Sequence, residues 1–201
     1  MHSGVLPRAL KALRGERPAV HIALYSYHSA AQLEGLRERS LDVALVSEPP
    51  AADDTDLDSA LVLNDSMLLA VPEGHPLAGQ RDVTADDLAA QHWIDVAQKE
   101  SALRHGTFVA VCAKAGFAPE ITVEATEPLA ALGLVAAGLG VTMIQQSLRH
   151  QEPEGVVLRE LPWFGYRTPL WVAWHKVNLR PLVGIFRKIL TSANSVALSD
   201  E

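Results

Sequence analysis

Apolar positions along this chain recur with two periods, and turn residues separate the segments that carry them. Spacings of three to four residues, as in Leu6, Leu10 and Leu13, predict helices with one buried face. Alternating or short apolar runs predict strands. By these patterns we predict helices over residues 4–14, from 29, from 84, and over 103–115, 128–138 and 181–190, and strands over 20–26, 42–46, 60–63, 67–71, 93–96, 120–124, 141–144, 156–161 and 170–174. Because strands and helices alternate, we expect an α/β fold with parallel sheets covered by helices.

Local signals predict where several elements begin and end. Gly15 is expected to end the first helix, and Ser29 with Gln32 has the spacing of a capping box at the start of the second. The acidic stretch 49–58 is predicted to be a loop, and the turn residues of 72–76 to cross between two lobes.

Composition narrows the class of protein. The 201 residues, 48% of them apolar, suit one large domain or two small lobes. A formal charge of −7, with no run of Lys and Arg, makes the chain by itself a poor nucleic-acid binder. The single cysteine excludes an internal disulfide and favours a reducing compartment. Since no secretory signal is visible and no apolar run approaches the roughly 20 residues of a membrane span, we expect a cytoplasmic protein without membrane contact.

Motifs for catalysis and metal binding are missing from the sequence. The chain has no Gly-x-Ser-x-Gly, no His-Glu-x-x-His and no phosphate-binding loop, so we expect no enzyme, no metal and no cofactor. The Gly138–Gly140 segment follows a helix pattern and is interpreted as its stop. Cys112 lies mid-helix and is interpreted as a buried, inert thiol. The large aromatic residues Trp93, Trp163, Phe164, Trp171 and Trp174 could line a pocket, but core packing is the favoured interpretation. Trp171 and Trp174 are expected on opposite faces of one strand, so that one of them can be core and the other not.

Three predicted helix starts could bind an anion. A helix amino terminus offers free N–H groups and partial positive charge, which suit a carboxylate. Such starts occur at residues 27–29, 99–101 and 126–128, each after a predicted strand. The alternative is that Ser29 and Thr126 only cap their helices.

The segment from Ala131 to Ile144, ALGLVAAGLGVTMI, resembles a signature of LysR-type transcriptional regulators. Further matches follow in the family's order over residues 4–7, 18–24, 32–44 and 68–77. Together they span nearly the whole chain, which is similar to the family's C-terminal effector-binding domain. The sequence around Leu132 to Val141 is most similar to that of the family branch that controls degradation of aromatic compounds.

The resemblance implies two Rossmann-like α/β lobes of the periplasmic-binding-protein type II kind, joined by two crossover segments. Lobe one would comprise residues 1–71 plus 169–201, and lobe two residues 72–168. The family's N-terminal winged helix-turn-helix domain is absent from this chain, and so is the first strand of lobe one. We therefore expect a fragment of a longer protein. It would assemble as a homodimer or homotetramer through this domain and meet DNA only through the absent one.

The resemblance also implies a site between the lobes for a small-molecule effector. By position, its residues would be His28, Ser29, Gln98, Lys99, Thr126, Glu127, Thr142 and Gln145. The expected ligand is a small organic acid, with aromatic and dicarboxylic acids as candidates. Glu127 could bind an amino group, so amino-acid-like effectors are also candidates. Gln145-Gln146 stands where the family more often has proline and a small residue. The alternative functions are a solute-binding protein of a transport system and an enzyme on the same fold.

Overall fold

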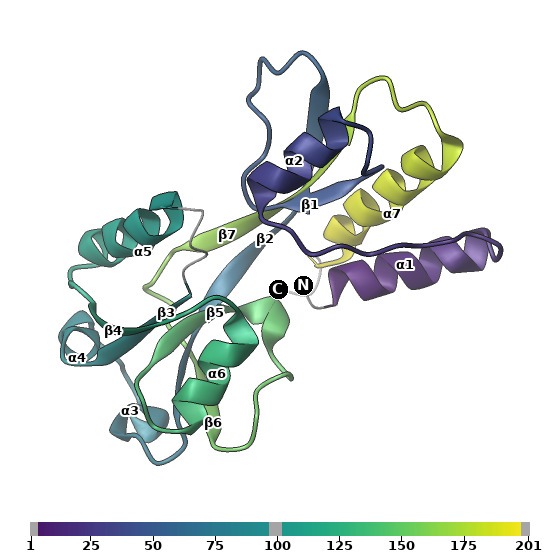
Figure 1. Cartoon of the computed structure of the whole chain (residues 1–201). Helices are drawn as coiled ribbons and strands as arrows, with labels where there is room; N and C mark the ends of the chain where they lie inside the picture. The colour runs from purple at the N-terminus through teal and green to yellow at the C-terminus, as the bar shows by residue number, and fades with distance from the viewer. Residues whose placement is uncertain (1–3, 97–101, 198–201) are drawn as a thin grey trace. The chain divides into compact units, whose positions relative to one another are not determined.

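The chain folds as two compact units in a computed structural model that describes residues 4–96 and 102–197 (Figure 1). Unit 1 is Met1–Asp65 with Thr168–Glu201, and unit 2 is Ser66–Arg167. The strand β2 (Leu57–Pro72) belongs to both, so the division falls inside it, after Asp65. The lobe bounds that the resemblance implies stay a prediction. The two strands predicted at 60–63 and 67–71 are this single strand, because no glycine or proline turns the chain between them.

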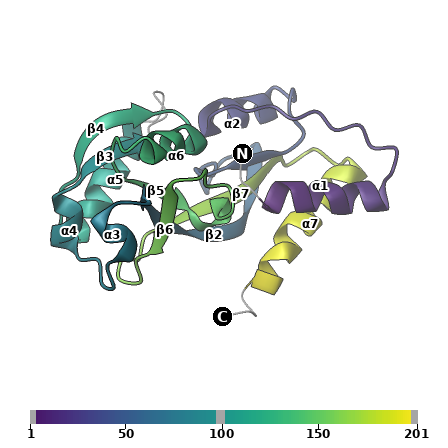
Figure 2. The same cartoon turned by 90° about the horizontal axis from the view of Figure 1, so that it is seen from below.

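Unit 1 has helices on both faces of its strands, which are β1 (Ala44–Val46), β7 (Arg167–His175) and the first part of β2. Its helices are α1 (Val5–Glu16), α2 (Ser29–Arg37) and α7 (Pro181–Ala197). β1 pairs antiparallel with β7, which is also the neighbour of β2. One buried cluster includes Ala9 of α1 and Leu190 of α7, the two helices that lie against each other in Figures 1 and 2. A second cluster, on the α2 face, includes Leu36 and Val46.

Two predictions for unit 1 are wrong. Residues 20–26 form no strand in the described structure, and Leu24 and Tyr25 are 56% and 62% exposed. A strand needs a neighbour for its N–H and C=O groups, and no described strand pairs with this segment. Gly15 does not end α1, which continues to Glu16; the Arg17 N–H still bonds the Leu13 carbonyl at 2.8 Å.

Unit 2 carries most of the remaining elements close to their predicted positions. They are α3 (Pro76–Gly79), α4 (Ala85–Ala89), β3 (His92–Val96), α5 (Ala102–Lys114), β4 (Glu120–Ala125), α6 (Pro128–Ala136), β5 (Thr142–Gln145), a short 3-10 turn (Gln146–Leu148) and β6 (Val156–Glu160). The expectation of parallel strands is right for β3 with β4 and for the bridge from Trp93 to Val141. β5 and β6 both pair antiparallel with β2, because β2 enters the unit in the opposite direction.

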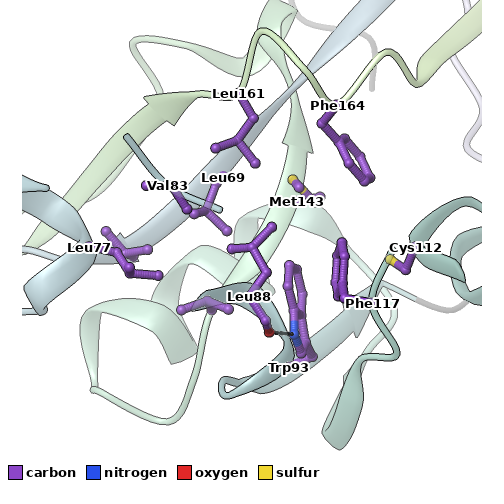
Figure 3. Close-up of a cluster of buried hydrophobic side chains, with 12 residues drawn as sticks. Leu69, Leu77, Val83, Leu88, Trp93, Cys112, Phe117, Met143, Leu161 and Phe164 are labelled. Carbon is purple, nitrogen blue, oxygen red and sulfur yellow. Dashed lines mark hydrogen bonds between the residues drawn. The ribbon is translucent and has the colours of Figure 1, made fainter. Parts of the chain in front are cut away.

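Aromatic and aliphatic residues fill the core of unit 2. Trp93 is fully buried, stacks near Phe117 at 5.7 Å between ring centroids, and donates its indole N–H to the Leu88 carbonyl at 3.0 Å (Figure 3). Phe164 belongs to the same cluster. The core role predicted for these rings is confirmed, whereas Trp163 is 42% exposed and bonds the Val83 carbonyl.

Candidate ligand-binding site

The amino terminus of α2 is capped by His28, not by Ser29. The Nδ1 atom of His28 accepts the Ala31 N–H at 3.4 Å, and its carbonyl accepts the Gln32 N–H at 3.0 Å. The Gln32 side chain donates to the carbonyl of Tyr27 at 2.7 Å. The predicted Ser29–Gln32 capping box is therefore wrong, because the helix begins one residue earlier than that motif requires.

The Ser29 hydroxyl instead ties α2 to the end of β1. Its Oγ lies 3.3 Å from the Ser47 Oγ and accepts the Ser47 N–H at 3.3 Å. Sequence reasoning missed Ser47, although it directly follows β1 and the carboxyl ends of strands are where ligands gather in α/β folds. Both serines are partly buried, so this edge of unit 1 offers hydroxyl groups at a defined position.

Electrostatics at this edge favour an anion. Within the described residues, the backbone N–H groups of Ser29 and Ala30 have no hydrogen-bond partner, and they carry the partial positive charge of the α2 amino terminus.

Unit 2 brings three predicted residues to one edge of its parallel strands. Thr126 and Glu127 follow β4, and Gln145 ends β5. Because β3 runs parallel to β4 and forms a parallel bridge with Val141, just before β5, the carboxyl ends of these strands share an edge. Thr126 and Glu127 are exposed there, and Glu127 precedes α6 without a side-chain capping bond. The alternative in which Ser29 and Thr126 serve as helix caps is thus wrong for both residues. His28 is the N-cap residue of α2, and Glu127 is the N-cap residue of α6.

The Thr142 hydroxyl is already used inside unit 2. It is 1% exposed and donates to the carbonyl of Ile94 at 2.7 Å, which fastens β5 to β3. The Thr142 hydroxyl oxygen can still accept a hydrogen bond from a ligand, but the hydroxyl hydrogen is already donated to Ile94. Gln98 and Lys99 lie outside the described residues. The prediction that residues of both units contact one ligand stays a prediction.

The described side chains offer no reactive thiol and no metal site. Cys112 is fully buried, and this burial, reinforced by Asp95, raises the pKa of its thiol to about 12. The prediction of a buried thiol is confirmed, and the raised pKa supports the prediction that the thiol is inert. Over residues 4–96 and 102–197 no three His, Cys, Asp or Glu side chains gather to hold a metal ion. In the same residues no helix is long and apolar enough to cross a membrane.

Comparison with known proteins identifies the family. The profile of the LysR substrate binding domain matches residues 1–195, so the chain belongs to this family. AlsR, an HTH-type transcriptional regulator of Bacillus subtilis, is 30% identical over 181 residues, covering 90% of this chain and 59% of AlsR. A probable hydrogen peroxide-inducible genes activator of Mycobacterium avium is 35% identical over 202 residues, covering 96% of this chain and 64% of that protein. The chain therefore spans less than two thirds of the length of these relatives.

Solved structures agree with the family in fold. The BenM effector binding domain with its effector benzoate is 23% identical, with a TM-score of 0.81 over 98% of this chain and 89% of that chain. The effector binding domain of QuiR in complex with shikimate is 18% identical, with a TM-score of 0.78 over 98% of this chain and 93% of that chain. The predicted fold class and the resemblance to LysR-type effector domains are both confirmed.

Proposed function

We propose that this domain senses a small organic acid, whose carboxylate binds at the amino terminus of α2. The observation that carries the proposal is the pair of unbonded N–H groups on Ser29 and Ala30, beside the Ser29 and Ser47 hydroxyls. Benzoate and shikimate, the ligands of the two similar structures, are both carboxylates. Aromatic and dicarboxylic acids are the first candidates. Glu127, if it contacts the ligand, favours an additional amino group.

In the full-length protein, we propose, ligand binding modulates transcription. A ligand shifts a protein between states only by its different affinity for them, which requires binding and no chemistry. We propose that DNA is bound by a part of the protein outside this chain, and that the protein is cytoplasmic. It also includes a homodimer or homotetramer formed through this domain. Partly exposed Leu6 and Leu10 on α1 support such a contact, which sedimentation equilibrium tests.

The test of the ligand proposal is a thermal-shift screen of carboxylic acids that includes benzoate and shikimate, followed by calorimetric titration of the acid that binds best. Replacing Ser29 with Ala removes a hydrogen bond to a charged group, so affinity should fall by roughly ten- to a hundredfold. Folding stability should also fall by about 1 kcal/mol, because Ser47 loses its partner. Binding and stability are therefore measured separately.

Ser40→Ala is the matched control for this substitution. Ser40 lies just beyond the opposite end of α2, where its hydroxyl donates to the Gly35 carbonyl at 3.2 Å. This variant should lose similar stability and keep its affinity. Equal affinities of the folded Ser29→Ala variant and the wild type, or a ligand without an anionic group, would contradict the proposed anion site.

A peroxide sensor is a second candidate, suggested by the name of the Mycobacterium avium relative. Thiol sensing requires an accessible thiolate. Cys112 is the only cysteine, it is fully buried, and its pKa is raised to about 12. We therefore expect peptide mass spectrometry to show unmodified Cys112 after treatment of the folded domain with hydrogen peroxide. Rapid formation of sulfenic acid at Cys112, faster than oxidation of the unfolded chain, would favour the redox function instead.

The transport and enzyme alternatives have less support. The chain belongs to the LysR substrate-binding family, and its curated relatives are transcriptional regulators. Cys112 is unsuited to attack a substrate, because its thiol is buried and the pKa of that thiol is raised to about 12. We therefore propose a binding domain rather than a catalyst.

A further inference from the structure

The indole N–H of Trp171 is a buried donor that has no hydrogen-bond partner in the part of the chain that the structure describes. The Nε1 atom has almost no solvent contact, and within the described residues no acceptor lies in hydrogen-bond reach. Leaving such a donor unpaired costs about 1–3 kcal/mol, so buried polar groups nearly always have a partner in the protein, in water or in a ligand. The unit 2 indoles of Trp93 and Trp163, by contrast, both donate to backbone carbonyls.

Strand register places Trp171 at the edge of unit 1 where α2 begins. Trp171 lies directly opposite Val46 in the β1–β7 pair, and opposite residues of an antiparallel pair project on the same face. Both belong to the cluster that packs under α2, together with Leu33. Ser47 follows Val46 along the chain, and Ser29 lies one helical turn before Leu33, on the same face of α2. The Trp171 side chain therefore lies on the face of the strands that α2 covers, the face toward which Ser29 and Leu33 of α2 are directed.

We propose that Trp171 is a specificity-determining residue, whose indole N–H donates a hydrogen bond to an oxygen of the bound acid. The inference rests on the proposed function and deepens it. The N–H groups of Ser29 and Ala30 hold one part of the carboxylate, and Trp171 binds a further acceptor of the same molecule. Because an indole N–H donates and never accepts, it selects an acid with an oxygen at that position and rejects one that presents an N–H or a methyl group there.

The decisive variant is Trp171→Phe, which removes the donor and keeps an aromatic ring on the strand. For the acid that binds best in the screen described above, we expect affinity to fall about five- to fiftyfold, as for loss of a buried hydrogen bond to a ligand. Trp163→Phe is the matched control, since its indole N–H bonds the Val83 carbonyl in unit 2. The control should leave affinity unchanged.

A second readout separates a ligand contact from a packing effect. The chain has four tryptophans, so a nitrogen–proton spectrum of the labelled protein shows four indole signals, and the Trp171→Phe variant identifies one of them. Addition of the best-binding acid should move the Trp171 indole signal downfield, as a new hydrogen bond does, and leave the Trp163 signal in place. A packing effect alone would not require a new hydrogen bond at this indole.

The outcomes distinguish this inference from the function on which it rests. If the acid binds the wild type, Ser29→Ala weakens binding and Trp171→Phe does not, the Trp171 contact is wrong and the proposed function stands. A Trp171 signal that stays in place during saturation likewise overturns the contact. If no carboxylic acid of the screen binds the wild type, the proposed function fails, and the Trp171 contact with it.

Discussion

Asp54 is the carboxylate that fixes the acidic loop of unit 1. Its oxygens accept the backbone N–H groups of Asp56 and Leu57 at 2.9 and 2.8 Å, and one of them accepts from Arg37 at 2.7 Å. The hydrogen bond from Leu57, followed by that from Arg37, lowers the pKa of Asp54 from 3.8 to about 2. Asp54 therefore organises the start of β2, although in the sequence it is only one of several acidic residues in this loop.

This carboxylate should make folding stability depend on pH in the acid range. The folded protein holds Asp54 at a lower pKa than the unfolded chain, so the contribution is fully present above about pH 4 and is lost as pH falls toward 2. Because solvent partly screens this carboxylate, the shift corresponds to about 1 kcal/mol of folding stability. Urea unfolding at pH 6 and at pH 3 should show a smaller loss of stability for Asp54→Asn than for the wild type. Asp53→Asn, at the exposed neighbour, should behave like the wild type; equal pH dependence in all three proteins would contradict the role of Asp54.

The candidate site shows which residue-level features sequence can predict. Spacing correctly predicted a helix start at Ser29, because helix patterns are local. It assigned the cap to the wrong residue, since His28 also has an acceptor and only the backbone geometry decides between them. Ser47 was missed as a candidate, and Trp171 was named only among the aromatic residues that could line a pocket, because their position beside α2 depends on strand register, which no local pattern reveals.

The connection from α6 to β5 is the element-level feature that the family signature encodes. α6 ends at Ala136, and Gly138 has a φ of +78°, so the interpretation of this glycine pair as a helix stop is confirmed. Gly140 has a φ of +152°, and a Cβ atom there would lie 2.5 Å from the His92 carbonyl oxygen. Only glycine allows the approach that lets Val141 and His92 bond at 2.9 Å.

Gly140→Ala should therefore be strongly destabilising. The added methyl group has to push β5 away from β3, which breaks the bond from the Val141 N–H to His92 and that from the Ile94 N–H to Val141. We expect a loss of roughly 2–4 kcal/mol in the free energy of unfolding, measured by urea denaturation.

Gly133→Ala is the control for this substitution. Gly133 lies inside α6 with nothing near its missing Cβ, and alanine favours helix, so stability should rise by up to about 1 kcal/mol. A Gly140→Ala variant as stable as the Gly133→Ala variant would show that the close approach is unimportant.

Elements with local signals were predicted well, and those that depend on distant partners were not. In unit 2, β3, β4 and α6 lie within a few residues of their predicted bounds, because apolar runs and turn residues mark them directly. Residues 20–26 have a strand pattern but no strand beside them, so pattern alone does not suffice. The direction of β5 and β6 was also missed, since it is set by pairing with the long strand β2.

At the scale of the whole molecule, the negative net charge distinguishes this domain from proteins that bind nucleic acid through a basic surface. Asp and Glu number 24 against 17 Lys and Arg, for a formal net charge of −7. Cations still gather on α1, where Arg8, Lys11 and Arg14 are exposed and bond no carboxylate among the described residues. Three cations on one helix can attract phosphates weakly at low salt, but sequence-specific readout needs side chains directed at base edges in a groove.

We therefore expect this chain to show no specific binding to duplex DNA. Phosphate contacts release counterions, so any weak complex formed through α1 at low salt should disappear by about 150 mM salt. A gel shift with duplexes of unrelated sequence should give the same faint, salt-sensitive retardation for each, and a variant with Arg8, Lys11 and Arg14 replaced by glutamine should lose it. A discrete complex at 150 mM salt that only one duplex competes away would contradict this expectation. It would also mean that the domain reads DNA itself, rather than reporting ligand binding to another part of the protein.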